Sequence, residues 1–133
     1  MASQFPTPTD RASFDGALSA VLADHAMLRR LAESVARPSG FSADATLSLA
    51  AHEAAEAALF ALPFLTRTPA EVTSSAARAR RRCKEYTAGN FGLPNPGATA
   101  ALFVDALLAH LDAEEAWLAH ERELRHERLM TAI

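Results

Sequence analysis

Residues 101–118 read ALFVDALLAHLDAEEAWL. Apolar residues recur at every third or fourth position of this stretch, and neither proline nor glycine interrupts it, so it predicts one long amphipathic helix. Its inner stripe consists of Phe103, Leu107, His110, Leu111, Glu114, Trp117 and Leu118. Two members of this stripe, His110 and Glu114, are ionisable. The stretch therefore predicts a helix that carries a histidine and a carboxylate into the core.

Three other stretches of the chain have the same helical period. They cover residues 13–36, 42–65 and 68–87. The helix that contains residues 101–118 extends from about Pro96 to about Arg128 and is the fourth in chain order. β-Branched residues are sparse, whereas Ala, Leu, Arg and Glu are abundant, as in all-α proteins. We therefore expect one all-α domain over residues 13–133, folded as an antiparallel up-down four-helix bundle with short connections.

Local signals predict where these helices begin and end. Residues 1–12 contain two prolines and no apolar period, so we expect them to form an extended N-terminal arm. Pro63 falls inside the second helical pattern and should kink that helix or end it early. Thr68, Pro69 and Glu71 have the order of a capping box at the start of the third helix, with Thr68 as the N-cap.

The overall composition excludes several classes of protein. A net charge of −3 argues against a dedicated nucleic-acid-binding protein, and the basic residues between Arg78 and Lys84 are expected to form a solvated helix face. No apolar run approaches the ~20 residues of a membrane span, and the N-terminus lacks the basic and apolar segments of a secretory signal. The single cysteine, Cys83, suits a reducing compartment, so we expect a cytoplasmic protein.

Five ionisable residues fall on the inner faces of three predicted helices. They are His25 in the first helix, His52 and Glu56 in the second, and His110 and Glu114 in the fourth. The two His/Glu pairs are each four residues apart, so the members of a pair share one helix face. Two carboxylates buried in one small core are costly unless positive charge lies nearby. A metal ion supplies that charge, and imidazole together with carboxylate suits iron, manganese or zinc.

The segments that carry these residues resemble the hemerythrin-like (HHE) family. Asp24–Arg29 reads DHAMLR and is similar to the first-helix signature of the family; His52–Phe60 reads HEAAEAALF and His110–Leu118 reads HLDAEEAWL, similar to its second- and fourth-helix signatures. The resemblance implies a left-handed four-helix bundle with a non-haem iron site. In that family the site usually holds two irons bridged by the two carboxylates, and it binds O2 or a related small molecule.

The predicted third helix departs from this family pattern. The family usually takes further histidines from that helix, but the inner stripe here is Val72, Ala76, Ala79, Cys83 and Tyr86. Three interpretations stay open at this point: Cys83 or Tyr86 is an additional ligand or contacts the ligands, the five His and Glu residues enclose a single ion, or the domain has lost its metal and serves as a scaffold. We favour a one-ion or atypical site, because missing histidines weaken the second iron position most.

These observations lead to a hypothesis about function and two alternatives. We expect a protein that binds, carries or senses O2, NO or iron at a site of one or two metal ions. Iron is the metal expected, and another divalent metal is the alternative. Asp24 and Glu53 are expected as neighbours of the ligands. This hypothesis favours binding over catalysis. The first alternative is a peroxidase-like or oxidase-like enzyme that uses the same metal with Cys83 or Tyr86 as redox partner. The second is a metal-free helical interaction module.

Overall fold

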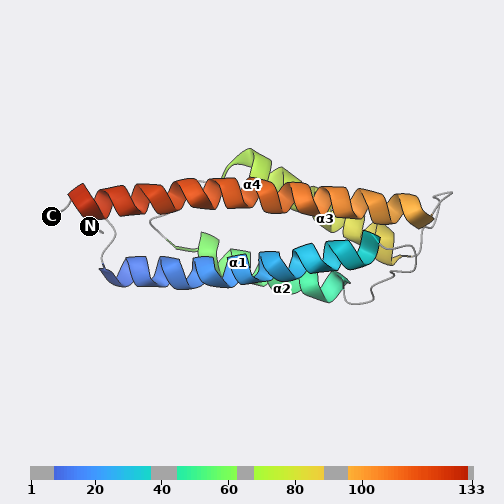
Figure 1. Cartoon of the computed structure of the whole chain (residues 1–133), viewed down its shortest axis with the longest axis horizontal. Coiled ribbons are helices and arrows are strands. Elements are labelled where there is room, and N and C mark those ends of the chain that lie inside the picture. The colour runs from blue at the N-terminus through green and yellow to red at the C-terminus, as the bar shows by residue number, and fades with distance from the viewer. Residues whose placement is uncertain (1–7, 37–44, 63–67, 89–95, 132–133) are drawn as a thin grey trace.

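The computed structural model describes residues 8–36, 45–62, 68–88 and 96–131. Within these residues the secondary structure is entirely helical, and Figure 1 shows the four elements. They are α1 (Pro8–Ala36), α2 (Ala45–Phe60), α3 (Ala70–Thr87) and α4 (Pro96–Thr131). None of these helices combines the length and the apolar content that a membrane crossing requires.

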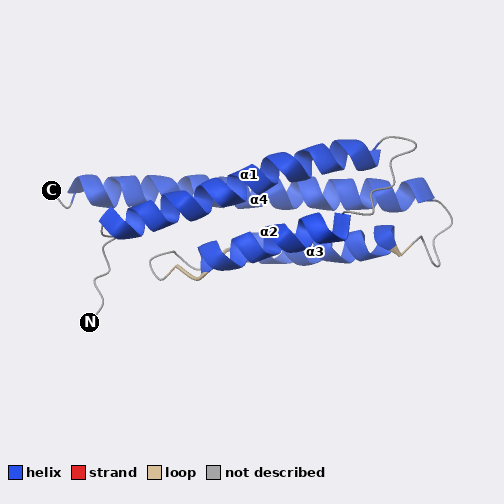
Figure 2. Ribbon diagram, turned by 90° about the horizontal axis from the view of Figure 1, so that it is seen from below, coloured by secondary structure: helices blue, strands red, loops and turns tan. Residues whose placement is uncertain are grey.

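The four helices pack as an antiparallel bundle, as predicted. Helix α1 packs against α2 and α4, and α3 packs against α4 and α2. In the described part of the chain the backbones of the diagonal pairs, α1 with α3 and α2 with α4, do not approach each other closely, so the helices form a closed ring around one core. Helices α1 and α4 contain 29 and 36 residues, against 16 and 18 for α2 and α3. Consequently α2 and α3 cover only part of the length of α1 and α4 (Figures 1 and 2).

The helix boundaries lie within about three residues of the sequence prediction except at the start of α1 and the end of α2. Helix α1 begins at Pro8, so residues 8–12 of the predicted arm are helical, and residues 1–7 lie outside the described part. Proline is compatible with a first helical turn, because its missing N–H would have no partner there. Helix α2 ends at Phe60, ahead of Pro63, as the proline rule suggests; Pro63 itself lies outside the described residues.

The predicted capping box at the start of α3 is wrong. The helix begins at Ala70, so Pro69 occupies the N-cap position, and no side-chain hydrogen bond caps the helix. Proline has no side-chain acceptor, and Thr68 lies one residue too early to take its place. The Pro69 carbonyl instead accepts hydrogen bonds from the N–H groups of Val72 and Thr73, at 3.1 and 3.2 Å.

The apolar core consists of two clusters. The first contains Leu28, Ala32, Val35, Ala45, Leu49, Cys83, Tyr86, Phe103, Leu107 and Leu111. The second contains Phe14, Leu18, Val21, Leu59, Val72, Trp117 and Leu118. Along α1, His25 lies between a segment of the second cluster and a segment of the first, and the order is reversed around His52 in α2 and Glu114 in α4, as antiparallel helices require. The ionisable residues therefore form a polar layer between two apolar clusters, which separate it from both ends of the bundle.

One predicted core residue lies at the surface. The apolar period of residues 13–36 predicts Leu22 on the inner stripe of this helix together with Val21 and Leu28, but the Leu22 side chain is 40% exposed. Val21, His25 and Leu28 define the buried line of this helix, and all three are at most 2% exposed. Because successive residues of a helix point about 100° apart, Leu22 is turned away from the line that Val21 occupies.

Candidate metal centre

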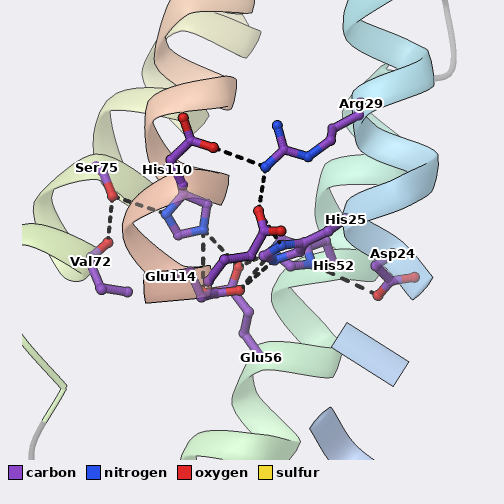
Figure 3. A network of polar contacts seen from close by, with 11 residues as sticks. Asp24, His25, Arg29, His52, Glu56, Val72, Ser75, His110 and Glu114 are labelled. Atoms are coloured by element: carbon purple, nitrogen blue, oxygen red, sulfur yellow. Dashed lines mark hydrogen bonds and ion pairs between the residues drawn. The ribbon is translucent and has the colours of Figure 1, made fainter. Parts of the chain in front are cut away.

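Four ionisable side chains converge at the middle of the bundle. His52 and Glu56 come from α2, and His110 and Glu114 come from α4. Each residue offers one ligand atom, and these atoms all lie within 4.8 Å of one another. All four side chains are buried, with exposed fractions between 0% and 6%. We call them the His2Glu2 cluster; Figure 3 shows its members pointing toward one another.

The imidazole Nε2 atoms of this cluster face both carboxylates. His110 Nε2 lies 2.9 Å from Glu56 Oε1 and 3.5 Å from Glu114 Oε2. His52 Nε2 contacts Glu56 Oε1 and lies 3.4 Å from Glu114 Oε1. Nitrogen and oxygen ligands bind Zn²⁺ at about 2.0–2.2 Å, so ligands of one ion are about 3–4 Å apart. The spacing of the His2Glu2 cluster is close to that range.

Two atoms that face the inside of the cluster are buried without a hydrogen bond. Among the described residues, His52 Nε2 and Glu114 Oε2 have no hydrogen-bond partner, although His52 Nε2 is in ion-pair contact with Glu56 Oε1 and Glu114 Oε2 lies 3.5 Å from His110 Nε2. Buried polar atoms in native proteins are paired in the great majority of cases, because desolvation without a partner costs about 1–3 kcal/mol. A cation between the two helices would satisfy both atoms, so the residues present fit a bound metal ion.

The charges of the cluster oppose the effect of burial on its pKa values. Burial alone would lower the pKa of His52, but the carboxylates of Glu114 and Glu56 outweigh burial by polar contact and by charge, and raise this pKa from 6.5 to about 9. Burial would likewise raise the pKa of Glu56, but His110 and His52 lower it from 4.5 to about 2. The metal-free cluster therefore holds a protonated His52 against an ionised Glu56 at neutral pH.

His25 joins the site through one carboxylate of the cluster. Its Nε2 atom lies 2.8 Å from Glu114 Oε1, and its ring packs edge-on against His52 with a centroid distance of 4.9 Å. The side chain is 1% exposed. His25 is not among the four residues whose ligand atoms all lie within 4.8 Å of one another. The structure thus brings the five predicted His and Glu residues together, four as a compact group and His25 at its edge.

The outer nitrogen, Nδ1, of each imidazole faces an oxygen atom. The pairs are His25 with Glu115 at 3.4 Å, His52 with Asp24 at 3.9 Å, and His110 with Ser75 at 3.0 Å. Oxygen acceptors at the outer nitrogen are typical of metal-binding histidines, since they orient the ring and leave the other nitrogen free for the metal. Of the three pairs only His110 with Ser75 forms a hydrogen bond, since Nδ1 of His25 and of His52 has no hydrogen-bond partner among the described residues.

A surface ion-pair network lies beside His25. Arg29 of α1 donates a hydrogen bond of 2.9 Å to Asp112 Oδ1 and contacts Glu115 Oε2, both on α4. These partners raise the pKa of the Arg29 guanidinium. Because Arg29 is more than a third exposed, we expect it to contribute at most about 1 kcal/mol to stability. Its structural effect is to hold Glu115 near the outer nitrogen of His25.

The other residues singled out from the sequence lie apart from the cluster. Cys83 is buried in the first apolar cluster, and burial raises the pKa of its thiol, whereas a metal ligand must be a thiolate. Tyr86 stacks on Phe103 with a centroid distance of 5.5 Å, and Phe103 precedes His110 by seven residues, about 10 Å along a helix. Glu53 pairs with Arg80 at the surface, at 2.9 Å. Of the two expected neighbours, only Asp24 faces a cluster histidine.

Three buried polar residues among those described were not predicted from the sequence: Ser75, Thr99 and Glu121. Ser75 is 6% exposed and contacts His110, and Glu121 is 0% exposed on α4. The helical period could have identified both. Ser75 follows Val72 by three residues and precedes Ala79 by four, and Glu121 follows Glu114 by seven. Both lie on stripes whose other members are core residues.

Comparison with protein-family models, with curated proteins and with solved structures finds no match for this chain. The fold and the site therefore define its class. It is a four-helix bundle in which α2 and α4 place a buried His2Glu2 cluster between two apolar clusters.

Proposed function

We propose that this protein binds one non-haem metal ion at the His2Glu2 cluster, with iron as the preferred metal, and that it carries or senses a small diatomic molecule such as O2 or NO. The observation that supports this most is the convergence of four buried side chains whose ligand atoms lie within 4.8 Å of one another, while His52 Nε2 and Glu114 Oε2 lack a hydrogen bond. Two histidines and two carboxylates also form the donor set that iron, manganese and zinc accept. The resemblance of all three segments to the hemerythrin-like family favours iron among these metals.

One ion fits the geometry better than two. His52, Glu56, His110 and Glu114 form a complete four-ligand set for a single ion. His25 lies next to that set and contacts Glu114, which leaves too few ligands for a second ion. In the described part of α3, no His, Cys, Asp or Glu joins the compact group. The family's usual second iron therefore lacks its protein ligands here.

The chain's own residues give the site its chemical character. The two carboxylates would balance the charge of a divalent ion, and the two imidazoles would add neutral nitrogen ligands. The two apolar clusters exclude bulk water from the polar layer. When bound, a non-haem iron centre supplies an open coordination position at which a small molecule can bind.

Metal titration of a matched pair of variants tests this proposal. His110→Ala removes an imidazole of the cluster, whereas His120→Ala removes an exposed histidine of the same helix. We expect the wild-type protein and His120→Ala to bind one equivalent of Fe²⁺ under anaerobic conditions, and His110→Ala to bind it far more weakly. Equal binding by the two variants would show that the cluster is not the site, and a wild-type protein without affinity for Fe²⁺ or Zn²⁺ would leave a metal-free helical module.

The small-molecule part of the proposal has its own test. The Fe²⁺-loaded protein should give the absorption and electron paramagnetic resonance signals of an iron–nitrosyl complex when NO is added. If Fe²⁺ binds but these signals do not appear, the protein is a metal-binding protein without the diatomic ligand. Sustained consumption of peroxide above the rate of free iron would instead support the enzyme alternative.

A further inference from the structure

Helix α3 contributes a hydrogen bond to the site although it contributes no ligand. The Ser75 hydroxyl oxygen lies 3.0 Å from His110 Nδ1 and also 3.0 Å from the carbonyl oxygen of Val72 (Figure 3). Ser75 is 6% exposed, and His110 is 1% exposed. The pair is thus a buried contact between α3 and α4, formed on the side of the imidazole that faces away from the cluster.

The number of hydrogens in this contact decides its direction. A serine hydroxyl has one hydrogen to donate and can accept others. The Val72 carbonyl is only an acceptor, so Ser75 donates its hydrogen to Val72. The same hydroxyl then accepts the Nδ1 hydrogen of His110. A neutral imidazole has only one N–H group, so a hydrogen fixed at Nδ1 leaves the lone pair of Nε2 available.

The other two imidazoles lack such a bond. Glu115 and Asp24 lie 3.4 and 3.9 Å from the outer nitrogens of His25 and His52, without hydrogen-bond geometry. His110 is therefore the one histidine of the site whose ring is held from outside by a formed hydrogen bond, within the described residues. Its Nε2 faces both carboxylates of the cluster, at 2.9 and 3.5 Å.

We infer that Ser75 is the positioning residue of the metal site: its hydroxyl, held by the Val72 carbonyl, fixes the Nδ1–H form and the ring orientation of His110 so that Nε2 can bind the ion. Helix α3 thereby supplies an outer hydrogen-bond partner in place of a ligand. This inference rests on the proposed metal binding at the His2Glu2 cluster. Loss of an outer partner of this kind typically weakens metal binding by about 10–100-fold.

Three substitutions of serine test the inference, with Zn²⁺ as the probe. Ser75→Ala removes the hydroxyl, and Ser75→Thr keeps it. Ser74→Ala is the matched control, because Ser74 is exposed and makes the same kind of bond to a carbonyl three residues earlier, to Glu71 at 3.4 Å. Alanine is a stronger helix former than serine, so a weaker affinity of Ser75→Ala does not come from an unfolded α3.

Competition against a chromophoric chelator gives the Zn²⁺ affinities, and nitrogen-15 NMR of the zinc-loaded proteins detects the Nδ1 hydrogen of His110. We expect Ser75→Ala to bind Zn²⁺ at least about tenfold more weakly than the wild type and to lose the slowly exchanging Nδ1 hydrogen. Ser75→Thr and Ser74→Ala should keep both the affinity and the NMR signal.

The outcomes separate this inference from the proposed function. A wild-type protein that binds no Zn²⁺ contradicts the proposed metal site and the role of Ser75 with it. If the wild type binds Zn²⁺ and Ser75→Ala binds it as tightly as Ser74→Ala does, the metal site stands and the role of Ser75 is refuted. A Ser75→Thr variant as weak as Ser75→Ala would show that the space at this position matters rather than the hydroxyl, which also refutes it.

Discussion

Replacing Glu114 by Gln should remove most of the stabilisation that a metal gives this protein. Glu114 is 0% exposed, and its Oε1 atom lies 2.8 Å from His25 Nε2 and 3.4 Å from His52 Nε2. Its Oε2 atom lies 3.5 Å from His110 Nε2. Glutamine keeps the size of the side chain, but it removes the negative charge and replaces one oxygen by an NH2 group, which cannot bind a cation.

The expected size of the effect follows from linkage. Loss of an outer partner typically weakens metal binding by about 10–100-fold, so loss of a ligand should cost at least about 100-fold. At a free metal concentration well above both dissociation constants, that factor removes about 2.7 kcal/mol of stabilisation. The unfolding entropy of about 2.1 cal/mol/K per residue amounts to about 0.28 kcal/mol/K for 133 residues. The metal-induced rise in Tm should therefore fall by about 10 °C.

Calorimetry with Zn²⁺ and with EDTA measures this rise. Glu121→Gln is the matched control, because Glu121 is also 0% exposed and follows Glu114 by seven residues on α4, yet lies outside the His2Glu2 cluster. We expect Glu121→Gln to lower the two Tm values equally and so to keep the full difference between them. A Glu114→Gln variant with the wild-type difference, or a Glu121→Gln variant that loses it, would refute the assignment of the ligands.

Four further results are expected. The metal-free protein should lose stability as the pH rises from 6.5 through about 9, because the raised pKa of His52 stabilises the folded state fully only below pH 6.5. It should also lose stability as the pH falls from 4.5 through about 2, because the lowered pKa of Glu56 stabilises the folded state above pH 4.5. Since a metal must displace the proton of His52, the metal-induced rise in Tm should be larger at pH 8 than at pH 6. Thermal denaturation with and without Zn²⁺ at the two pH values measures this rise, and an equal rise at both would contradict the prediction. Cys83→Ser should lower the free energy of unfolding, because it places a hydroxyl in an apolar cluster, and should leave the metal content per folded chain unchanged; a fall in metal content would make Cys83 a ligand. His25→Ala should weaken Zn²⁺ binding less than His110→Ala does, because His25 lies at the edge of the cluster. Equal losses of Zn²⁺ affinity in a titration of the two variants would instead show that His25 is also a ligand.

The helical period was enough to predict the bundle and the core of the site. Histidines and glutamates at i and i+4 in two helices had to share a face, and a face that also carries leucines had to be buried. The structure confirms this burial for His52, Glu56, His110 and Glu114. Helix ends were less certain, because the start of α3 depends on one residue: once Pro69 takes the N-cap position, Thr68 cannot cap the helix.

The contribution of α3 could not be derived from the apolar pattern. A search for ligands on this helix selects Cys83 and Tyr86, but both lie in the first apolar cluster. Ser75 is closer in sequence to the start of the helix and has no ligand chemistry, so only its contact with His110 in the folded bundle reveals its role. In the same way, the periodicity cannot show that His25 lies at the edge of the cluster, because the distance between side chains of different helices depends on how the helices are rotated in the bundle.

The number of metal ions per chain tests the central claim most directly. The protein should be purified after expression with added iron, and its metal and protein contents measured on the same sample by plasma mass spectrometry and amino-acid analysis, with Glu114→Gln prepared in parallel. The geometry of the His2Glu2 cluster predicts one ion per wild-type chain and almost none in the variant. A value near zero for the wild type, or a value near two, would contradict the account.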